Sequence, residues 1–238
     1  TVGRYPRMQT SSLAATQATR HDPEFNPQSA SHEVPLNRPA QEDIATSLPP
    51  EMNRSRRRIL WGTVAIMAVS AVVLRLMGQP IWCKCGEWSP WSWDIWSRHN
   101  SQHFIDPYTF THVLHGIPLC GLLYWLPRSV PEWVRFLIAM LLEAVWEIQE
   151  NSPFIIERYR AVTISQDYFG DSVANSVGDI LACALGYWIA FHWRTRRSLI
   201  FFLVTELILA IWIRDNLTLN VVMLLFPSDA IQQWQLGK

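Results

Sequence analysis

Residues 59–77 read ILWGTVAIMAVSAVVLRLM, and this stretch decides the fold. It is nearly all apolar, and as a helix it is long enough to cross the roughly 30 Å hydrocarbon core of a bilayer. Four further apolar stretches follow, at residues 110–126, 133–150, 172–193 and 199–213. We therefore predict an all-α fold, a polytopic transmembrane helix bundle of about five spans.

The composition of the whole chain agrees with a membrane protein. Of its 238 residues, 49% are apolar and 17% are charged, whereas an average soluble protein has about 25% charged residues. The chain has 13 tryptophans, and this residue concentrates at membrane–water interfaces. Since the formal net charge is zero, nothing global indicates nucleic acid as a partner.

The N-terminal segment differs from the rest of the chain. Residues 1–53 are mostly polar, so we expect a flexible polar tail ahead of a transmembrane domain at residues 54–238. Arg4, Arg7 and Arg20 precede the first acid, which loosely resembles an organellar transit peptide. An ordinary flexible tail is the favoured interpretation.

The arginines predict the orientation. They gather before the first stretch, after the second and after the fourth: Arg54, Arg56, Arg57, Arg58, Arg128, Arg135, Arg194, Arg196 and Arg197. Five alternating spans place all three groups on one side, with the N-terminus, and the positive-inside rule makes that side cytoplasmic or matrix. The loops at residues 78–109 and 151–171 then face the opposite side. The expected location is a bacterial inner membrane or a mitochondrial inner membrane.

Polar side chains recur on the predicted spans at helical spacing. Three acids of the third stretch share one face, as do two histidines of the second and an Asp–Asn–Asp row that opens the fourth. Buried charge is expensive in a bilayer, so these faces should turn inward and meet in one polar cluster near the outer leaflet. The candidate members of this cluster are His103, Asp106, His112, His115, Glu143, Glu147, Glu150, Asn151, Arg158, Arg160, Asp167, Asp171, Asn175 and Asp179.

Five long motifs carry a resemblance to a known family. They read WCKCG, NSQHFIDPYTFTHVLHG, EAVWEIQENSPFIIERYR, TISQDYFGDSVANSVGDILAC and WIRDNLTLN. Over residues 77–225 the chain resembles a family of uncharacterised multi-pass bacterial inner-membrane proteins, a domain of unknown function. More distantly it resembles the VanZ-like proteins, whose looser pattern matches Glu147, Arg158, Asp171, Asn175 and Gly178. The resemblance implies a helical membrane fold with an outward polar site, and it implies no particular reaction.

The predicted polar cluster admits three chemical interpretations. Histidine and carboxylate ligands are adequate for a divalent metal such as zinc, manganese or iron, although the paired Glu-x-x-His motifs of di-iron bundles are absent from the sequence. The second interpretation is an interhelical network of hydrogen bonds and ion pairs, in which each contact stabilises by only about 0.6 kcal/mol. A bound polar ligand or lipid headgroup is the third.

Arg158 and Arg160 have two interpretations of equal weight. They lie on a loop that faces the predicted cluster, so they could fork onto a lipid phosphate. They could instead pair with Glu157, Asp167 or Asp171.

The cysteines and one acid of the fifth stretch need separate treatment. The C-x-C spacing of Cys83 and Cys85 is poor for a mutual disulfide. These two could bind a metal or cofactor or pair with another chain, but a plain structural role is favoured. Cys120 and Cys183 lie within predicted helices and should act as small apolar residues. Glu206 is expected to be a buried partner of another helix.

Two functions stay open. The first is a non-catalytic accessory or scaffold subunit of an inner-membrane assembly, whose cluster binds lipid or another ligand and whose partners are membrane lipids and other membrane proteins. The second is a membrane-embedded hydrolase or transferase on a lipid headgroup, with Glu147 or Asp171 as general base, His115 as acid and Arg158 on the phosphate. We rank the first ahead, because no complete catalytic constellation is readable and no G-x-S-x-G elbow is present.

Overall fold

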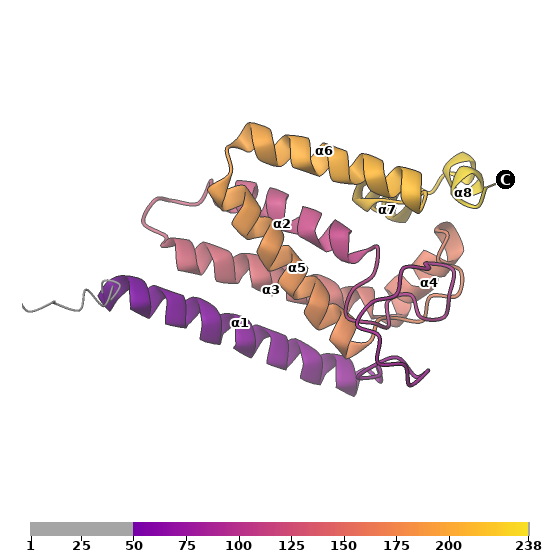
Figure 1. Ribbon diagram of the computed structural model, residues 1–238, viewed down its shortest axis with the longest axis horizontal. Helices are drawn as coiled ribbons and strands as arrows, with labels where there is room; N and C mark the ends of the chain where they lie inside the picture. The colour runs from indigo at the N-terminus through magenta and orange to yellow at the C-terminus, as the bar shows by residue number, and fades with distance from the viewer. Residues whose placement is uncertain (1–49, 238) are drawn as a thin grey trace, which may run out of the picture. The chain divides into compact units, whose positions relative to one another are not determined.

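The computed structural model describes residues 50–237, so most of the predicted polar tail, residues 1–49, lies outside it. Over the described residues the fold is all-helical, with no strand, which confirms the all-α part of the prediction. The elements, labelled in Figure 1, are α1 Pro50–Leu76, α2 Thr109–Leu123, α3 Glu132–Glu150, α4 Pro153–Val162, α5 Val173–His192, α6 Thr195–Trp212, α7 Leu217–Leu225 and α8 Asp229–Gln235.

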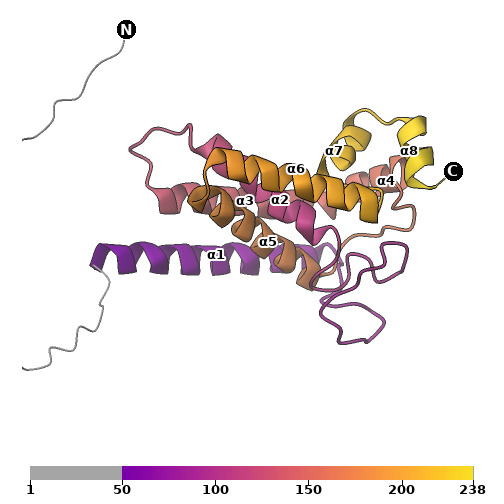
Figure 2. The ribbon, with the colours of Figure 1, turned by 45° about the horizontal axis from the view of Figure 1, so that its top comes forward.

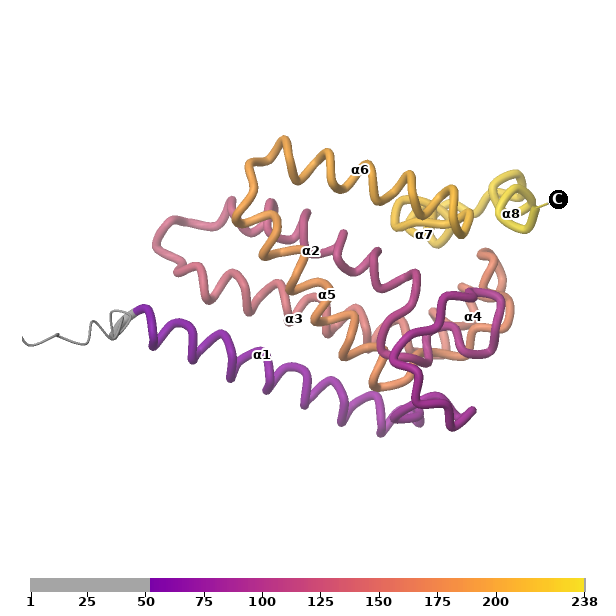
Figure 3. The backbone as a smooth tube through the Cα atoms, viewed as in Figure 1, coloured from indigo at the N-terminus to yellow at the C-terminus, as the bar shows by residue number. Residues whose placement is uncertain are grey.

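Five of these helices coincide with the five apolar stretches, and they run alongside one another. In Figures 1 and 2, the start of α1 and the α2–α3 and α5–α6 connections lie at one end of the bundle. The tube in Figure 3 shows residues 77–108, α4, α7 and α8 gathered at the other end. α5 is central, since it contacts α1, α2, α3 and α6. Polar side chains that these elements carry can therefore converge beside α5.

Two of the five helices are long and apolar enough to cross a membrane, Met52–Leu76 and Val173–His192. α2 is apolar but has only 15 residues, whereas α3 and α6 are longer but carry several charged residues. The predicted number of five spans therefore goes beyond what length and composition establish.

Glycine lets α2 and α5 approach closely. A Cβ added at Gly116 would collide with the carbonyl oxygen of Cys183, and one added at Gly186 would collide with that of Val113. Small residues at such crossings allow two backbones to pack in contact. This contact fixes the relative position of the polar residues on the two helices.

The loop at residues 77–108 covers the start of α5. The Ser172 hydroxyl accepts a hydrogen bond from Asn175 N at 3.1 Å, which is an ordinary N-cap. The Ser172 N–H donates to Ser101 O at 2.9 Å and the Val173 N–H donates to Pro80 O at 2.8 Å. The loop thus satisfies N–H groups that a helix start leaves free.

Short helices lie outside the five predicted spans. One is α7, a separate helix that follows Arg214, whose φ is 55°. Glu206 is the reason, because its carboxylate accepts from the N–H groups of Leu217 and Thr218 at 3.0 Å each. Residues 151–171, expected as a loop, contain α4, which begins after the N-cap Ser152.

Candidate functional site

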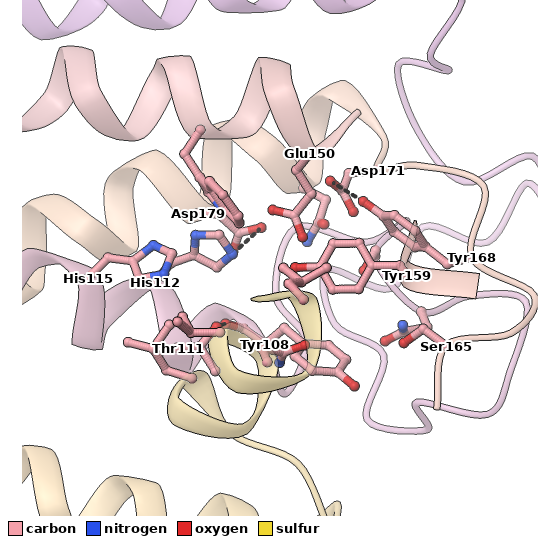
Figure 4. Close-up of a pocket in the computed structure, with 18 residues that line it drawn as sticks. Tyr108, Thr111, His112, His115, Glu150, Tyr159, Ser165, Tyr168, Asp171 and Asp179 are labelled. Carbon is pink, nitrogen blue, oxygen red and sulfur yellow. Dashed lines mark hydrogen bonds and ion pairs between the residues drawn. The ribbon is translucent and has the colours of Figure 1, made fainter. Parts of the chain in front are cut away.

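A cavity of about 320 Å³ lies at the loop-bearing end of the bundle, among α2, α3, α4, α5 and α7. Figure 4 shows its side chains converging from these elements. Six of the predicted cluster residues line the cavity: His112, His115, Glu150, Asp171, Asn175 and Asp179. The structure therefore brings together residues that lie far apart in the sequence.

The lining of this cavity is acidic on one side and apolar on the other. Glu150, Asp171 and Asp179 contribute carboxyl groups, and no lysine or arginine is among the lining residues that the structure describes. α7 supplies Leu217 and Val221 on the apolar side. Such a lining favours a positively charged group over a phosphate.

Histidines and carboxylates form a tight network at the inner end of the cavity. His112 Nδ1 lies 2.6 Å from Glu143 Oε1, and His115 Nδ1 lies 2.9 Å from the same oxygen. Glu143 therefore accepts from the Nδ1–H of both rings. This leaves His112 Nε2, 3.9 Å from Asp179 Oδ2, with a free lone pair.

Two carboxylates of this network lack hydrogen-bond donors. Glu147 is fully buried, and neither of its oxygens makes a hydrogen bond within residues 50–237, although Oε1 lies 3.2 Å from His112 Nδ1. Asp179 is 3% exposed, and its Oδ1 is also without a partner. A buried carboxylate without a donor or cation is costly. The two groups therefore favour the binding of a cation or a proton at this point.

Two overlapping sets have ligand atoms that could hold a metal. The first set is His112, Glu147 and Asp179, and the second is His112, His115 and Glu143. In each set, one ligand atom from each residue lies within 4.8 Å of the other two. The first set adjoins the unpartnered oxygens, whereas Glu143 is already engaged by both histidines.

Asp171 occupies the outer part of the cavity. Its Oδ2 accepts hydrogen bonds from Asn151 Nδ2 and from the Tyr168 hydroxyl, both at 2.9 Å. Burial raises the pKa of Asp171 to about 7, although both hydrogen bonds oppose the rise. Burial and nearby carboxylates raise the pKa of Tyr159 and Tyr168 well above 10, so both phenols stay protonated as donors.

Three other predicted cluster residues lie apart from the cavity. Asp106 is buried and caps its own loop, accepting from Ser101 N at 3.0 Å and Tyr108 N at 2.8 Å. His103 lies in the loop at residues 77–108, with its Nδ1 on the Ser89 carbonyl. Asp167 is exposed.

Among the described residues, neither arginine expected beside the cluster lines the cavity or pairs with an acid. Arg158 donates to the Leu224 carbonyl at 2.9 Å, and Arg160 donates to the Tyr168 carbonyl. The expected pairs with Glu157, Asp167 or Asp171 do not form.

Sequence reasoning missed the aromatic part of the lining. Tyr108, Trp146, Tyr159 and Tyr168 all line the cavity. Aromatic side chains are largely apolar, so in a sequence they look like residues of the hydrophobic core. Only their position next to the predicted acids in the chain could have suggested a role.

The fold and the cavity define an all-helical protein with an acidic interior site. Residues 74–237 match the family described as "Protein of unknown function (DUF2585)", and the chain belongs to this family. This confirms the expected membership in an uncharacterised bacterial family. No solved structure matches the chain.

The relatives of this chain are bacterial proteins. A UPF0314 protein from Rhizobium meliloti (strain 1021) is 44% identical over 187 residues, covering 78% of this chain and 95% of the relative. One from Brucella anthropi is 46% identical over 187 residues, covering 74% and 92%. One from Paracoccus denitrificans is 44% identical over 189 residues, covering 79% and 97%. These names carry no activity, and the distant VanZ resemblance stays a prediction.

Proposed function

We propose that this protein is a multi-pass bacterial inner-membrane protein that binds a divalent metal ion at the base of an acidic cavity. Membrane insertion is supported by the inside-out distribution of polarity. Leu203, Leu207 and Ile211 of α6 are more than half exposed, whereas Glu143 and Glu147 of α3 are buried. A soluble monomer rarely exposes apolar surface of that extent.

The arrangement of the helix ends supports five spans, with the arginine-rich helix ends all on one side of the membrane. The start of α1 and the α2–α3 and α5–α6 connections lie together in Figure 1. Arg58 of α1 stacks over the Trp133 ring at the start of α3, with its Cζ 4.9 Å from the ring centroid. By the positive-inside rule this end is cytoplasmic, and the cavity opens toward the periplasmic side.

One observation carries the metal assignment. The carboxylate of Glu147 is fully buried without a hydrogen-bond donor, and it lies in one ligand-atom cluster with His112 and Asp179. One imidazole and two carboxylates suit zinc, manganese or iron(II). Glu143 would act as the outer partner that orients His112 through its Nδ1–H.

The role we favour is binding. Three protein ligands leave a metal position open toward the cavity, where the acidic and apolar walls suit a small ligand or a lipid headgroup that carries a positively charged group. The exposed apolar faces of α1 and α6 would meet lipid or other subunits of an inner-membrane assembly. No arginine of the described residues lines the cavity, so Arg158 has no part in this proposal.

A metal-dependent hydrolase or transferase acting on a lipid headgroup is the second candidate. It is favoured by Asp171, which lines the same cavity and whose pKa of about 7 suits a general base. Turnover of a lipid substrate by the purified, metal-loaded protein, lost in Asp171→Asn, would favour this candidate over a binding role.

Metal analysis of detergent-purified protein tests the proposal. We expect Glu147→Gln and Asp179→Asn each to lose one equivalent of divalent metal relative to the wild type. Glu157→Gln, on an exposed residue of α4, is the matched control and should lose none. Unchanged metal content in both cavity variants, with native helicity by circular dichroism, would overturn the proposal.

If the variants do not fold, the proposal is tested on the wild-type protein, which is stripped of metal with a chelator and then loaded with Mn²⁺. Its electron paramagnetic resonance spectrum should show one bound, ordered ion that zinc displaces. A spectrum of free aqueous Mn²⁺ only would also overturn the proposal.

A further inference from the structure

A second cluster of metal-ligating side chains lies outside the cavity, in the loop between α1 and α2. Its members are Cys83, Cys85, His99 and His103, and one ligand atom from each lies within 4.8 Å of all the others. Cys83 Sγ is 3.4 Å from His99 Nδ1. The fold of the loop therefore brings a C-x-C pair and an H-x3-H pair of the sequence together in space.

The backbone of the loop brings the two thiols to the same side. Residues Cys83 to Gly86 form a tight turn, with Gly86 N donating to Cys83 O at 3.3 Å and Gly86 at φ 79°. The N–H of Glu87 donates to Cys85 Sγ at 3.3 Å. Both cysteines are free, so neither is consumed by a disulfide in this structure.

His103 is oriented as a metal ligand would be. Its Nδ1 donates to the Ser89 carbonyl at 2.5 Å, which places the free lone pair on Nε2. That Nε2 atom is buried and has no hydrogen-bond partner in the described part of the chain, and the residue is 1% exposed. Metal-bound histidines characteristically hold their second ring nitrogen in this way.

The ligand set selects the metal. Two thiolates and two imidazoles form the closed tetrahedral set of structural zinc sites. Zn–S bonds of about 2.3 Å and Zn–N bonds of about 2.0–2.1 Å require ligand atoms roughly 3.3–3.8 Å apart. The cluster therefore needs only a small contraction to close around the ion.

We propose that Cys83, Cys85, His99 and His103 bind one structural Zn²⁺ that holds this loop over the start of α5. The His103 carbonyl accepts from Asn175 Nδ2 at 2.9 Å, and Asn175 lines the acidic cavity. The Ser172 hydroxyl donates to the carbonyl of Gln102, beside the ligand His103, at 3.0 Å. Zinc thus stabilises the loop at residues 77–108, which adjoins the cavity. This zinc is distinct from the ion proposed at the base of the cavity.

Cobalt substitution of the full-length, detergent-purified chain tests the proposal. The Co²⁺ form should show a thiolate-to-metal charge-transfer band and the strong visible bands of a tetrahedral site. The double variant Cys83→Ser/Cys85→Ser should lose the band and one equivalent of zinc. Cys120→Ser, on a cysteine of α2 outside the cluster, should keep both, and His99→Cys should strengthen the charge-transfer band.

Two further measurements keep the proposal falsifiable if the double variant fails to fold. In the wild type, chelation should expose two thiols to alkylation at Cys83 and Cys85, and added Zn²⁺ should protect them again. In Glu147→Gln the charge-transfer band should persist, which separates this proposal from the cavity ion. A disulfide between Cys83 and Cys85, or alkylation indifferent to zinc, would overturn it.

Discussion

The carboxyl group of Asp215, in the connection between α6 and α7, makes stability depend on pH. It is 1% exposed and accepts hydrogen bonds from Tyr108, Asn216, Asn220 and Gln235. Burial nevertheless raises its pKa from the ordinary 3.8 to about 7. The folded protein therefore holds this proton more tightly than the unfolded chain does.

The sign and size of the effect follow from proton linkage. Well below pH 3.8 the carboxyl is protonated in both states, and its contribution to stability is fully present. Between pH 3.8 and about 7 only the folded state keeps the proton, so the free energy of unfolding falls by about 1.4 kcal/mol per pH unit. The total loss is at most about 4 kcal/mol, from roughly three pH units at that slope.

Thermal unfolding in detergent from pH 4 to pH 9 measures this loss, and Asp215→Asn is the comparison. We expect the variant to lack this part of the slope, because its amide does not titrate. Infrared difference spectra should show a protonated carboxyl band that titrates near pH 7 in the wild type and is missing in the variant. Identical pH profiles for the two proteins would refute the reasoning.

Two further perturbations test the packing and the helix connections. Gly186→Ala should destabilise the protein by about 1–3 kcal/mol or prevent folding, because its Cβ would collide with the Val113 carbonyl; in thermal melts Gly121→Ala, which meets nothing within 4 Å, should behave as wild type. Glu206→Gln should cost about 1–2 kcal/mol by removing the charged acceptor at the start of α7. Hydrogen exchange should then become faster at the N–H groups of Leu217 and Thr218. Unchanged exchange at these two groups would contradict the role of Glu206.

Hydropathy was sufficient to locate the five long helices but not the short ones. The α3 prediction at 133–150 and the observed Glu132–Glu150 agree closely, because a long apolar face with inward acids has one clear period. α4 was missed, since its ten residues mix charged and apolar side chains. The separation of α7 from α6 depends on a tertiary contact of Glu206, which no local pattern reveals.

The candidate site was predictable where residues share a helix face and not where loops decide. The inward acids and histidines of α2, α3 and α5 follow from spacing alone. His103 was assigned to the same cluster, although its side chain lies beside Cys83 and Cys85. The C-x-C and H-x3-H spacings could have indicated this, but only the loop fold brings them together. Arg158 was also assigned to the cluster, whereas its guanidinium donates to the carbonyl of Leu224, which is distant in the chain and could not be foreseen from local spacing.

Anomalous diffraction from crystals grown in a lipid phase tests the central account most directly. We expect an anomalous peak between His112, Glu147 and Asp179, in molecules whose α1 and α6 face lipid. The absence of any peak there at saturating metal, or crystals of a protein that stays soluble and monodisperse without detergent, would contradict it.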